Sequence, residues 1–263
     1  MSQWYFHWFF CSNSVDFMNL VQLASNIKKF FLDLLFPIEC LGCGLDGVWV
    51  CDSCLNTIGL NLDNQCVVCS RPCFNGLTHG ECRHKNLLDQ VIFCADSNSK
   101  LLHQIIYRFK YNFIQELKYP LGEIMINKII YEKQQGNDLF FGDNLVLVPV
   151  PLHKKRLKWR GFNQAALLAC QLADFLEVDS REDILFRRKY NKPQVKLNRK
   201  TRLENLKNSF AVNPDFRHSY SFKNCSFLLV DDILTTGVTL SECARILKQA
   251  GARRVAAIVL CRG

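Results

Sequence analysis

The chain has 263 residues, of which 49% are hydrophobic and 22% are charged. This composition excludes an intrinsically disordered chain, and the length allows one or two domains with a substantial core. The formal net charge of +9 favours acidic partners such as nucleic acid, phosphorylated ligands or an anionic membrane surface, and no uncharged apolar run reaches the length of about 18 residues that predicts a membrane-spanning helix.

Residues 1–36 predict an N-terminal extension that ends in an amphipathic helix. Residues 1–16 are rich in aromatic side chains but lack a basic start and a small-residue cleavage site, so a signal peptide fits poorly. Two interpretations stay open: the aromatic cluster inserts at a membrane interface, or translation starts at Met18. Residues 17–36 carry one apolar stripe, which either packs on the protein itself or makes a peripheral membrane contact.

Residues 37–88 predict a small zinc-ribbon module. Two Cys-x-x-Cys pairs in this segment are separated by seven residues. The apolar residues 48–50 between them are expected to form one strand of a hairpin. Such pairs in a chain without a clear export signal indicate metal binding in a reducing, cytoplasmic compartment rather than disulfides. The expected ligands of a structural zinc ion are Cys40, Cys43, Cys51 and Cys54.

A second, irregular cysteine cluster follows between residues 66 and 84. Cys66 and Cys69 form one pair, and Cys82 is the expected third ligand. The other half of the site is open between Cys82 with His79, Cys82 with His84, and Cys73 with Cys82. The segment is therefore either a second zinc site or a vestigial hairpin with free thiols.

Residues 89–263 alternate between short apolar runs and helical patterns, which predicts an α/β domain with a mainly parallel sheet flanked by helices. The expected strands cover residues 91–95, 145–150, 184–187, 227–230 and 255–261. The expected helices cover residues 101–109, 114–130, 163–176 and 240–247. Residues 187–202 predict a basic loop. Four scattered cysteines are expected to be small core residues, namely Cys170, Cys225, Cys243 and Cys261.

A basic segment directly follows the strand expected at 145–150. Its cations are Lys154, Lys155, Arg156, Lys158 and Arg160. Two aromatic residues, Trp159 and Phe162, lie within or next to it. Cations for the phosphates and aromatic faces for the bases are what single-stranded nucleic acid prefers. The alternative is a solvated basic loop.

The most informative stretch begins at Phe227. Its apolar strand ends in Asp231 and Asp232, and a turn with three hydroxyls around Gly237 leads into a helix. In open parallel sheets, ligands bind at the carboxyl ends of the strands. Backbone N–H groups of the turn and the helix N-terminus suit a phosphate, whereas paired carboxylates suit the hydroxyls of a ribose or a metal ion. A sugar phosphate fits both features.

The positions from Phe227 to Thr239 resemble the ribose-phosphate motif of the type I phosphoribosyltransferases, which bind 5-phosphoribosyl-1-pyrophosphate. The resemblance implies that Asp231 and Asp232 hold the ribose hydroxyls and are the catalytic residues, and that Mg²⁺ accompanies the pyrophosphate. The implied 5′-phosphate ligands are Thr235, Thr236, Gly237 and Thr239. The implied pyrophosphate contacts are Pro149, Val150, Pro151, Leu152 and Arg202.

A wider resemblance covers about residues 32–262. The runs 149–152 and 160–164, followed by Gln194, Leu197, Arg202, Asn205 and Phe210, are similar to the ComF family of competence proteins. This resemblance implies a zinc ribbon ahead of a type I phosphoribosyltransferase-like domain. It also implies a role in natural transformation, with single-stranded DNA and other DNA-uptake proteins as partners, in the cytoplasm or peripheral to the inner membrane. The alternative is an active phosphoribosyltransferase with an unidentified acceptor.

Overall fold

The computed structural model describes residues 37–138, 144–189, 208–216 and 222–263. The predicted helix at 17–36 and Arg202 lie outside these residues. The chain divides into two compact units, Met1–Cys51 and Asp52–Gly263. Residues 52–88 thus belong to the larger unit, and the three-part division 1–36, 37–88 and 89–263 stays a prediction.

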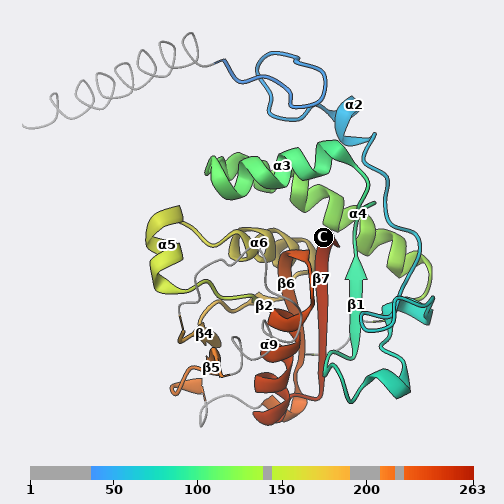
Figure 1. Ribbon diagram of the computed structural model, residues 1–263, viewed down its shortest axis with the longest axis vertical. Coiled ribbons are helices and arrows are strands. Elements are labelled where there is room, and N and C mark those ends of the chain that lie inside the picture. Colours follow the sequence, from blue (N-terminus) through green and yellow to red (C-terminus); the bar gives the residue numbers. More distant parts are fainter. Residues whose placement is uncertain (1–36, 139–143, 190–207, 217–221) are drawn as a thin grey trace, which may run out of the picture. The chain divides into compact units, whose positions relative to one another are not determined.

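A five-stranded sheet forms the centre of the larger unit (Figure 1), with the strand order β1–β7–β6–β2–β3. Every pair of neighbouring strands is parallel, which confirms the predicted α/β class. The strands β1, β2, β6 and β7 are mostly apolar because they are buried, as parallel strands between helices are, whereas the edge strand β3 is polar and not buried. Their bounds are β1 Gln90–Phe93, β2 Leu145–Pro149, β3 Asp179–Ser180, β6 Ser226–Leu234 and β7 Arg254–Arg262.

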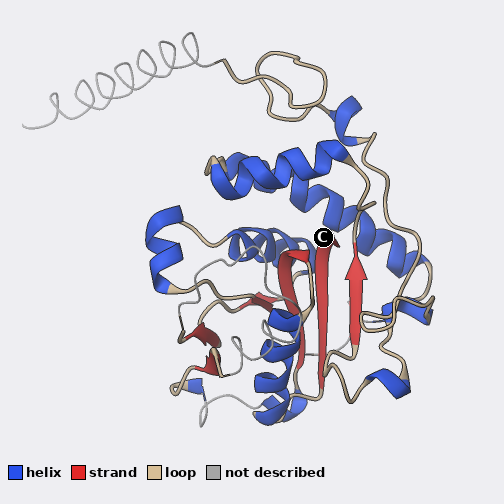
Figure 2. Cartoon of the chain, viewed as in Figure 1, coloured by secondary structure: helices blue, strands red, loops and turns tan. Residues whose placement is uncertain are grey.

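Helices cover both faces of this sheet (Figure 2). On one face α6 packs on β2 and β6 and contacts α4, and on the other α9 packs on β6 and β7. None of the helices in the described residues is long and apolar enough to cross a membrane. The helices are α2 Asp52–Leu55, α3 Lys100–Tyr111, α4 Lys118–Gln134, α5 Lys154–Arg160, α6 Gln164–Leu176 and α9 Val238–Gln249.

The connections of the sheet create a switch point between β2 and β6. From β2 the chain runs outward through α6 to the edge strand β3, whereas from β6 it runs in the opposite direction through α9 to β7. Loops that leave two neighbouring strands toward opposite faces open a crevice at their carboxyl ends. The loops after β2 and β6, which hold the predicted ligand residues, therefore start side by side at this point.

Smaller elements complete the larger unit. The strands β4 Leu185–Arg187 and β5 Phe210–Val212 form an antiparallel pair. Isolated bridges join Leu60 to Ala95 and Leu77 to Gln90, so the second cysteine segment lies on the β1 edge of the sheet. The 3-10 helices are η1 Phe74–Gly76, η2 Gly80–Cys82, η3 Gln115–Leu117 and η5 Phe222–Asn224.

Four local predictions need correction. The strand expected to end at Val230 continues through the acidic pair, because parallel pairing with β7 extends to Leu234 opposite Arg262. The helix expected at 114–130 begins at Lys118, after η3. Residues 48–50 are irregular rather than a strand. Cys170 is exposed on α6, whereas Cys225, Cys243 and Cys261 are buried as expected.

A buried ion pair attaches the second cysteine segment to α4. Lys128 Nζ lies 2.7 Å from Glu132 Oε1, and neither side chain is exposed to solvent. Lys128 also donates a hydrogen bond to the carbonyl of Asn61, and the side chain of Asn64 donates to Glu132 at 3.2 Å. Charges at this depth are tolerated only when paired, so the pair fixes the path of residues 61–64 across α4.

Replacing Lys128 with Met is expected to destabilise the protein by about 3–5 kcal/mol, because it leaves the Glu132 carboxylate buried without its cation. Chemical denaturation measures this change in the free energy of unfolding. The matched double variant, Lys128→Met with Glu132→Gln, removes both charges and should recover part of the loss. Equal losses for the single and the double variant would contradict this account of the pair.

Candidate functional site

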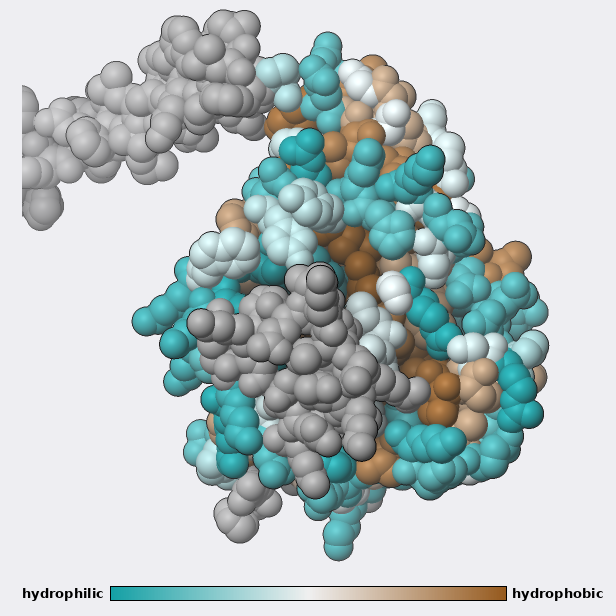
Figure 3. Space-filling model, viewed as in Figure 1, coloured by the Kyte–Doolittle hydropathy of each residue, from teal (hydrophilic) through white to brown (hydrophobic). Residues whose placement is uncertain are grey.

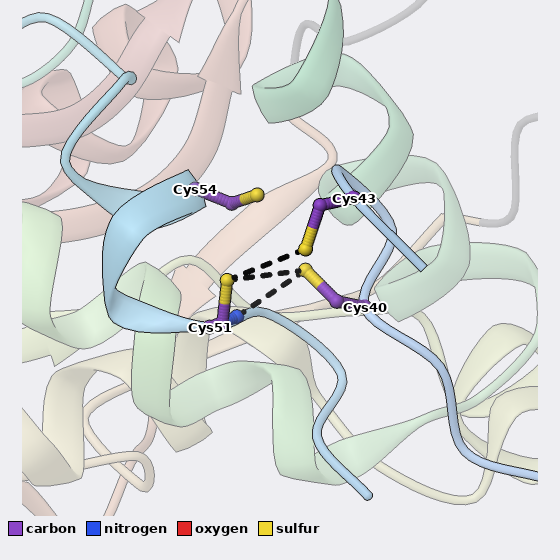
Figure 4. Close-up of side chains that lie close together, drawn as sticks. All are labelled: Cys40, Cys43, Cys51 and Cys54. Atoms are coloured by element: carbon purple, nitrogen blue, oxygen red, sulfur yellow. Dashed lines mark hydrogen bonds between the residues drawn. The ribbon is translucent and has the colours of Figure 1, made fainter. Parts of the chain in front are cut away.

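The first cysteine cluster brings four thiols together (Figure 4). The ligand atoms of Cys40, Cys43, Cys51 and Cys54 all lie within 4.8 Å of one another. The Sγ atom of Cys51 lies 3.7 Å from that of Cys40 and 3.6 Å from that of Cys43. Sulfur atoms that each lie about 2.3 Å from one tetrahedral zinc ion are roughly 3.8 Å apart, so the arrangement fits zinc.

The electrostatics of this cluster also suit a cation. Burial raises the pKa of Cys40, but hydrogen bonds from the backbone N–H groups of Cys51, Cys43 and Gly42 outweigh burial and lower that pKa to about 6. The thiolate is the form that binds metal. Four sulfur ligands leave no position open for substrate, which is typical of a structural rather than a catalytic zinc site.

The second cluster has a definite set of candidate ligands. The ligand atoms of Cys66, Cys69, His79 and Cys82 lie within 4.8 Å of one another. His79 Nδ1 is 3.3 Å from Cys69 Sγ. Among the alternatives left open by the sequence, the geometry selects His79 with Cys82, and neither Cys73 nor His84 joins the group. Three sulfurs and one imidazole form a recognised structural zinc set.

The second cluster lies against the sheet that carries the acidic pair. Val67, between its first two cysteines, packs on the hydrophobic core of the larger unit. Arg262, the last residue of β7, donates a hydrogen bond from Nη1 to Ser70 Oγ. A metal ion at this cluster would therefore hold a loop that touches the functional edge of the sheet.

The acidic pair lies at the carboxyl end of β6, where its strand neighbours are β2 and β7. Asp231 is half-buried and Asp232 is buried. The backbone N–H of Asp232 donates to Asp231 Oδ1 at 2.9 Å, and that of Ile233 donates to Asp232 Oδ1 at 2.6 Å. Lys110, from the end of α3, lies 2.8 Å from Asp232 Oδ1. These contacts hold both carboxylates at the crevice between β2 and β6.

The surroundings of Asp231 disfavour its charged form. Burial and the neighbouring Asp232 raise the pKa of Asp231 to about 7, although Lys110 and Arg187 act in the opposite direction. Strong pKa perturbation by burial and a charged neighbour is typical of functional sites. Arg187 stands at the end of β4, so an otherwise peripheral strand supplies a cation to the site.

The turn after β6 has the geometry of a phosphate-binding loop. Gly237 is buried and adopts a φ of 71°, a left-handed conformation that favours glycine. It is the residue before α9, whose first N–H groups have no partners within the helix. Thr236 and Thr239 are half-buried, and Thr235 is exposed. The turn thus presents hydroxyls and backbone donors together, as a phosphate requires.

The turn after β2 lies beside the acidic pair. The N–H of Val150 donates to the carbonyl of Val230 at 2.9 Å. Val150 and Pro151 are buried, and Leu152 is half-buried. The Asn163 side chain donates to the Val150 carbonyl at 3.2 Å and so holds the turn against the start of α6. The predicted pyrophosphate residues 149–152 therefore lie next to the predicted ribose residues.

Two donors at this edge have no hydrogen-bond partner among the described residues. Gln164 is only 2% exposed, yet its Nε2 makes no hydrogen bond, and the same holds for Nε of Arg160. Arg160 donates from Nη1 to Gln164 Oε1. Burial lowers the pKa of Arg160, and the negative charge of Asp232 opposes that shift. Unpaired buried donors are costly and suit an anionic ligand.

The basic segment forms the helix α5 rather than an irregular loop. Lys154, Lys155 and Lys158 are exposed, and Arg156 is half-buried. Of its two aromatic neighbours, Trp159 is exposed, but Phe162 is buried against Phe109 with ring centroids 5.6 Å apart. Phe162 therefore belongs to the core, and only Trp159 is available to a ligand.

Sequence reasoning missed three residues of the site. Lys110 and Arg187 reach the acidic pair from other elements, and neither lies near it in the sequence. Gln164 was recognised only as part of a resemblance, without a role. The sole sequence signal for Lys110 is its place at the end of an amphipathic helix, where cations are common, so only the tertiary structure identifies it.

Comparisons with known proteins agree with this geometry. Residues 157–263 match the phosphoribosyl transferase domain family. The chain is 30% identical over 208 residues to competence protein ComFC of Bacillus subtilis, covering 77% of this chain and 79% of that protein. It is 27% identical over 228 residues to DNA utilization protein YhgH of Escherichia coli K12, covering 81% of this chain and 96% of that protein. With competence protein F of Haemophilus influenzae it is 36% identical over 109 residues, which span 41% of this chain and 46% of that protein.

The parallel sheet, the acidic strand end and the glycine turn define a phosphoribosyltransferase-like domain. A cysteine cluster compatible with a zinc ribbon precedes it in the sequence. The chain belongs to the ComF family of competence proteins.

The two cysteine clusters predict the zinc content of the protein. Elemental analysis of the purified protein should find two zinc atoms per chain, since both sets of ligand atoms fit the ion. His79→Ala should reduce the zinc content toward one atom per chain, whereas the matched variants His84→Ala and Cys73→Ser should leave the zinc content unchanged. Full zinc content in His79→Ala would show that the second ligand set is wrong.

A second testable prediction follows from the raised pKa of Asp231. The folded-state pKa of about 7 lies above the unfolded value near 3.9, so its contribution to stability is present below about pH 4 and is lost as the pH rises through 7. Asp231→Asn should therefore gain stability relative to the parent protein between pH 4 and pH 8. Thermal unfolding across this range measures the difference, with Asp174→Asn, an exposed carboxylate on α6, as control. A difference that does not change with pH would contradict the assignment.

Proposed function

We propose that the chain binds 5-phosphoribosyl-1-pyrophosphate with Mg²⁺ at the carboxyl ends of β2 and β6 and takes part in DNA uptake. The observation that carries the proposal is the acidic pair beside two anion-suited turns at one switch point. A ligand for this edge must offer hydroxyls to the carboxylates and phosphates to both turns. Phosphoribosyl pyrophosphate has a diol between a phosphate and a pyrophosphate.

In this proposal Asp231 and Asp232 accept hydrogen bonds from the ribose hydroxyls. The ion pair between Lys110 and Asp232 neutralises the site in the free protein, and the hydroxyls take over part of that role when the ligand binds. The residues Thr235, Thr236, Gly237 and Thr239 bind the 5′-phosphate through backbone donors and hydroxyls. The left-handed Gly237 supports this role because it turns the chain directly into α9.

The pyrophosphate would lie over the turn formed by residues 149–152. The unpaired donors of Arg160 and Gln164 support this placement, since they are buried beside that turn and lack acceptors. Arg202 is a further proposed contact from the residues outside the described part of the chain. Mg²⁺ would be held mostly by ligand oxygens and water, where it neutralises pyrophosphate charge.

The DNA-uptake role is supported by the relatives, two of which are named competence proteins and one a DNA utilization protein. The exposed cations of α5 are proposed to bind the backbone of single-stranded DNA. These are Lys154, Lys155 and Lys158, joined by the half-buried Arg156 and by Arg160 at the end of the helix. The partners would include other DNA-uptake proteins, at a cytoplasmic location peripheral to the inner membrane.

The second candidate is an active phosphoribosyltransferase. The match to the phosphoribosyl transferase domain family, which includes the acidic pair, favours it. The reaction would break the bond between ribose C1 and the pyrophosphate and join C1 to an acceptor. Asp231 and Asp232 would stabilise the positive charge that develops on the ribose ring. The two candidate functions differ in the acceptor, which only the phosphoribosyltransferase requires.

Converting the pair to Asp231→Asn and Asp232→Asn is expected to lower the affinity for phosphoribosyl pyrophosphate about 100-fold or more, because two charge-assisted hydrogen-bond acceptors are lost. Isothermal titration in the presence of Mg²⁺ measures the dissociation constants. Asp174→Asn is the matched control, since it removes a carboxylate from the far end of α6.

Circular dichroism should show that the double variant is folded. An unchanged affinity in a folded double variant would remove the acidic pair from the proposed site.

A further inference from the structure

Four exposed aromatic rings gather where α3 and α5 end. Tyr107 and Tyr111 have ring centroids 5.0 Å apart, and Phe113 meets Trp159 edge-on, also at 5.0 Å. Tyr107 is 58% exposed, Tyr111 51%, Phe113 37% and Trp159 61%. These four residues are called the aromatic platform below.

The core does not require these rings. The inner face of α3 is filled by Leu102, Ile105, Ile106 and Phe109, all buried. Single exposed aromatic residues are ordinary on protein surfaces, but two ring pairs from α3, α5 and the residues just after α3 indicate a binding surface. Hydrophobic surface is also visible in a hollow between α3 and the carboxyl ends of β6 and β7 (Figure 3).

The charge around the platform specifies the partner. Neither α3 nor α5 contains an acidic residue. Arg108 is exposed on α3, as are the lysines of α5, and the Arg160 guanidinium lies 5.9 Å from the centre of the Tyr111 ring. A surface with flat aromatic faces beside the cations of two helices that lack acidic residues fits a polyanion that carries unpaired bases.

The platform begins at the proposed ribose site. Tyr111 directly follows Lys110, which contacts Asp232. Trp159 directly precedes Arg160, whose guanidinium lies over the Tyr111 ring. Lys110 thus contacts the acidic pair, and an exposed ring stands beside the last cation of each helix. A strand that lies on the rings would pass the mouth of the ribose site.

We propose that the aromatic platform binds single-stranded DNA by stacking unpaired bases on Tyr107, Tyr111 and Trp159, while the cations of α5 hold the phosphates. The inference rests on the proposed DNA-binding function and adds to it the recognition of bases. Stacking needs a base but not a particular sequence, because every base has an aromatic face. The platform therefore distinguishes DNA with bases from a bare sugar-phosphate chain.

The test compares an oligo-dT strand with an abasic strand of the same length, by fluorescence anisotropy on the full-length, zinc-loaded protein. The parent protein should bind oligo-dT at least tenfold more tightly than the abasic strand. Trp159→Ala should lose about tenfold in affinity for oligo-dT and little for the abasic strand, and Tyr107→Ala should change in the same direction. The salt dependence should stay the same, since no cation is removed.

Phe175→Ala is the matched control. Phe175 is an aromatic residue of α6, 43% exposed, near the opposite end of that helix from Gln164. Base stacking on the platform would be contradicted if the parent protein bound both strands equally, or if Trp159→Ala and Tyr107→Ala kept the parent affinity for oligo-dT. Neither result would contradict DNA binding itself. Failure of the parent protein to bind either strand would overturn the proposed DNA-binding function itself.

Discussion

The placement of two carboxylates side by side at the buried end of β6 constrains the rest of the structure. Burial disfavours charge, and the pKa of Asp231 near 7 reflects that cost. Cations from separate elements therefore act on the pair: Lys110 of α3 contacts Asp232, and the charges of Arg187 on β4 and Arg160 on α5 interact with the carboxylates at longer range. Elements far apart in the sequence are thereby tied to one point of the sheet.

The same constraint explains the chemistry of the edge. A carboxylate pair surrounded by cations and unpaired donors is poised for a ligand that brings hydroxyls and phosphates together. The second cysteine cluster lies on this sheet too, with Val67 packed on the core and Ser70 bonded to Arg262. A metal ion there would hold this loop in place, because all four of its candidate ligands lie between Cys66 and Cys82.

Local patterns in the sequence predict most of the elements but not how they meet. The apolar runs locate the main strands, and the motif from Phe227 to Thr239 locates the turn, because both depend on neighbours in the chain. The strand order, the extension of β6 to Leu234 and the contact of Lys110 depend on tertiary pairing instead. Likewise, only the folded chain shows that His79 rather than His84 joins the second cluster.

The most direct test of the central claim is a calorimetric titration of the unmodified protein with phosphoribosyl pyrophosphate and Mg²⁺, with and without single-stranded DNA. The account predicts saturable binding whose affinity changes when DNA is present, because the ribose site and the α5 cations share Arg160. An affinity for phosphoribosyl pyrophosphate that is the same with and without DNA would favour the phosphoribosyltransferase candidate. Absence of binding under both conditions would contradict the claim that the acidic edge of the sheet is a phosphoribosyl pyrophosphate site.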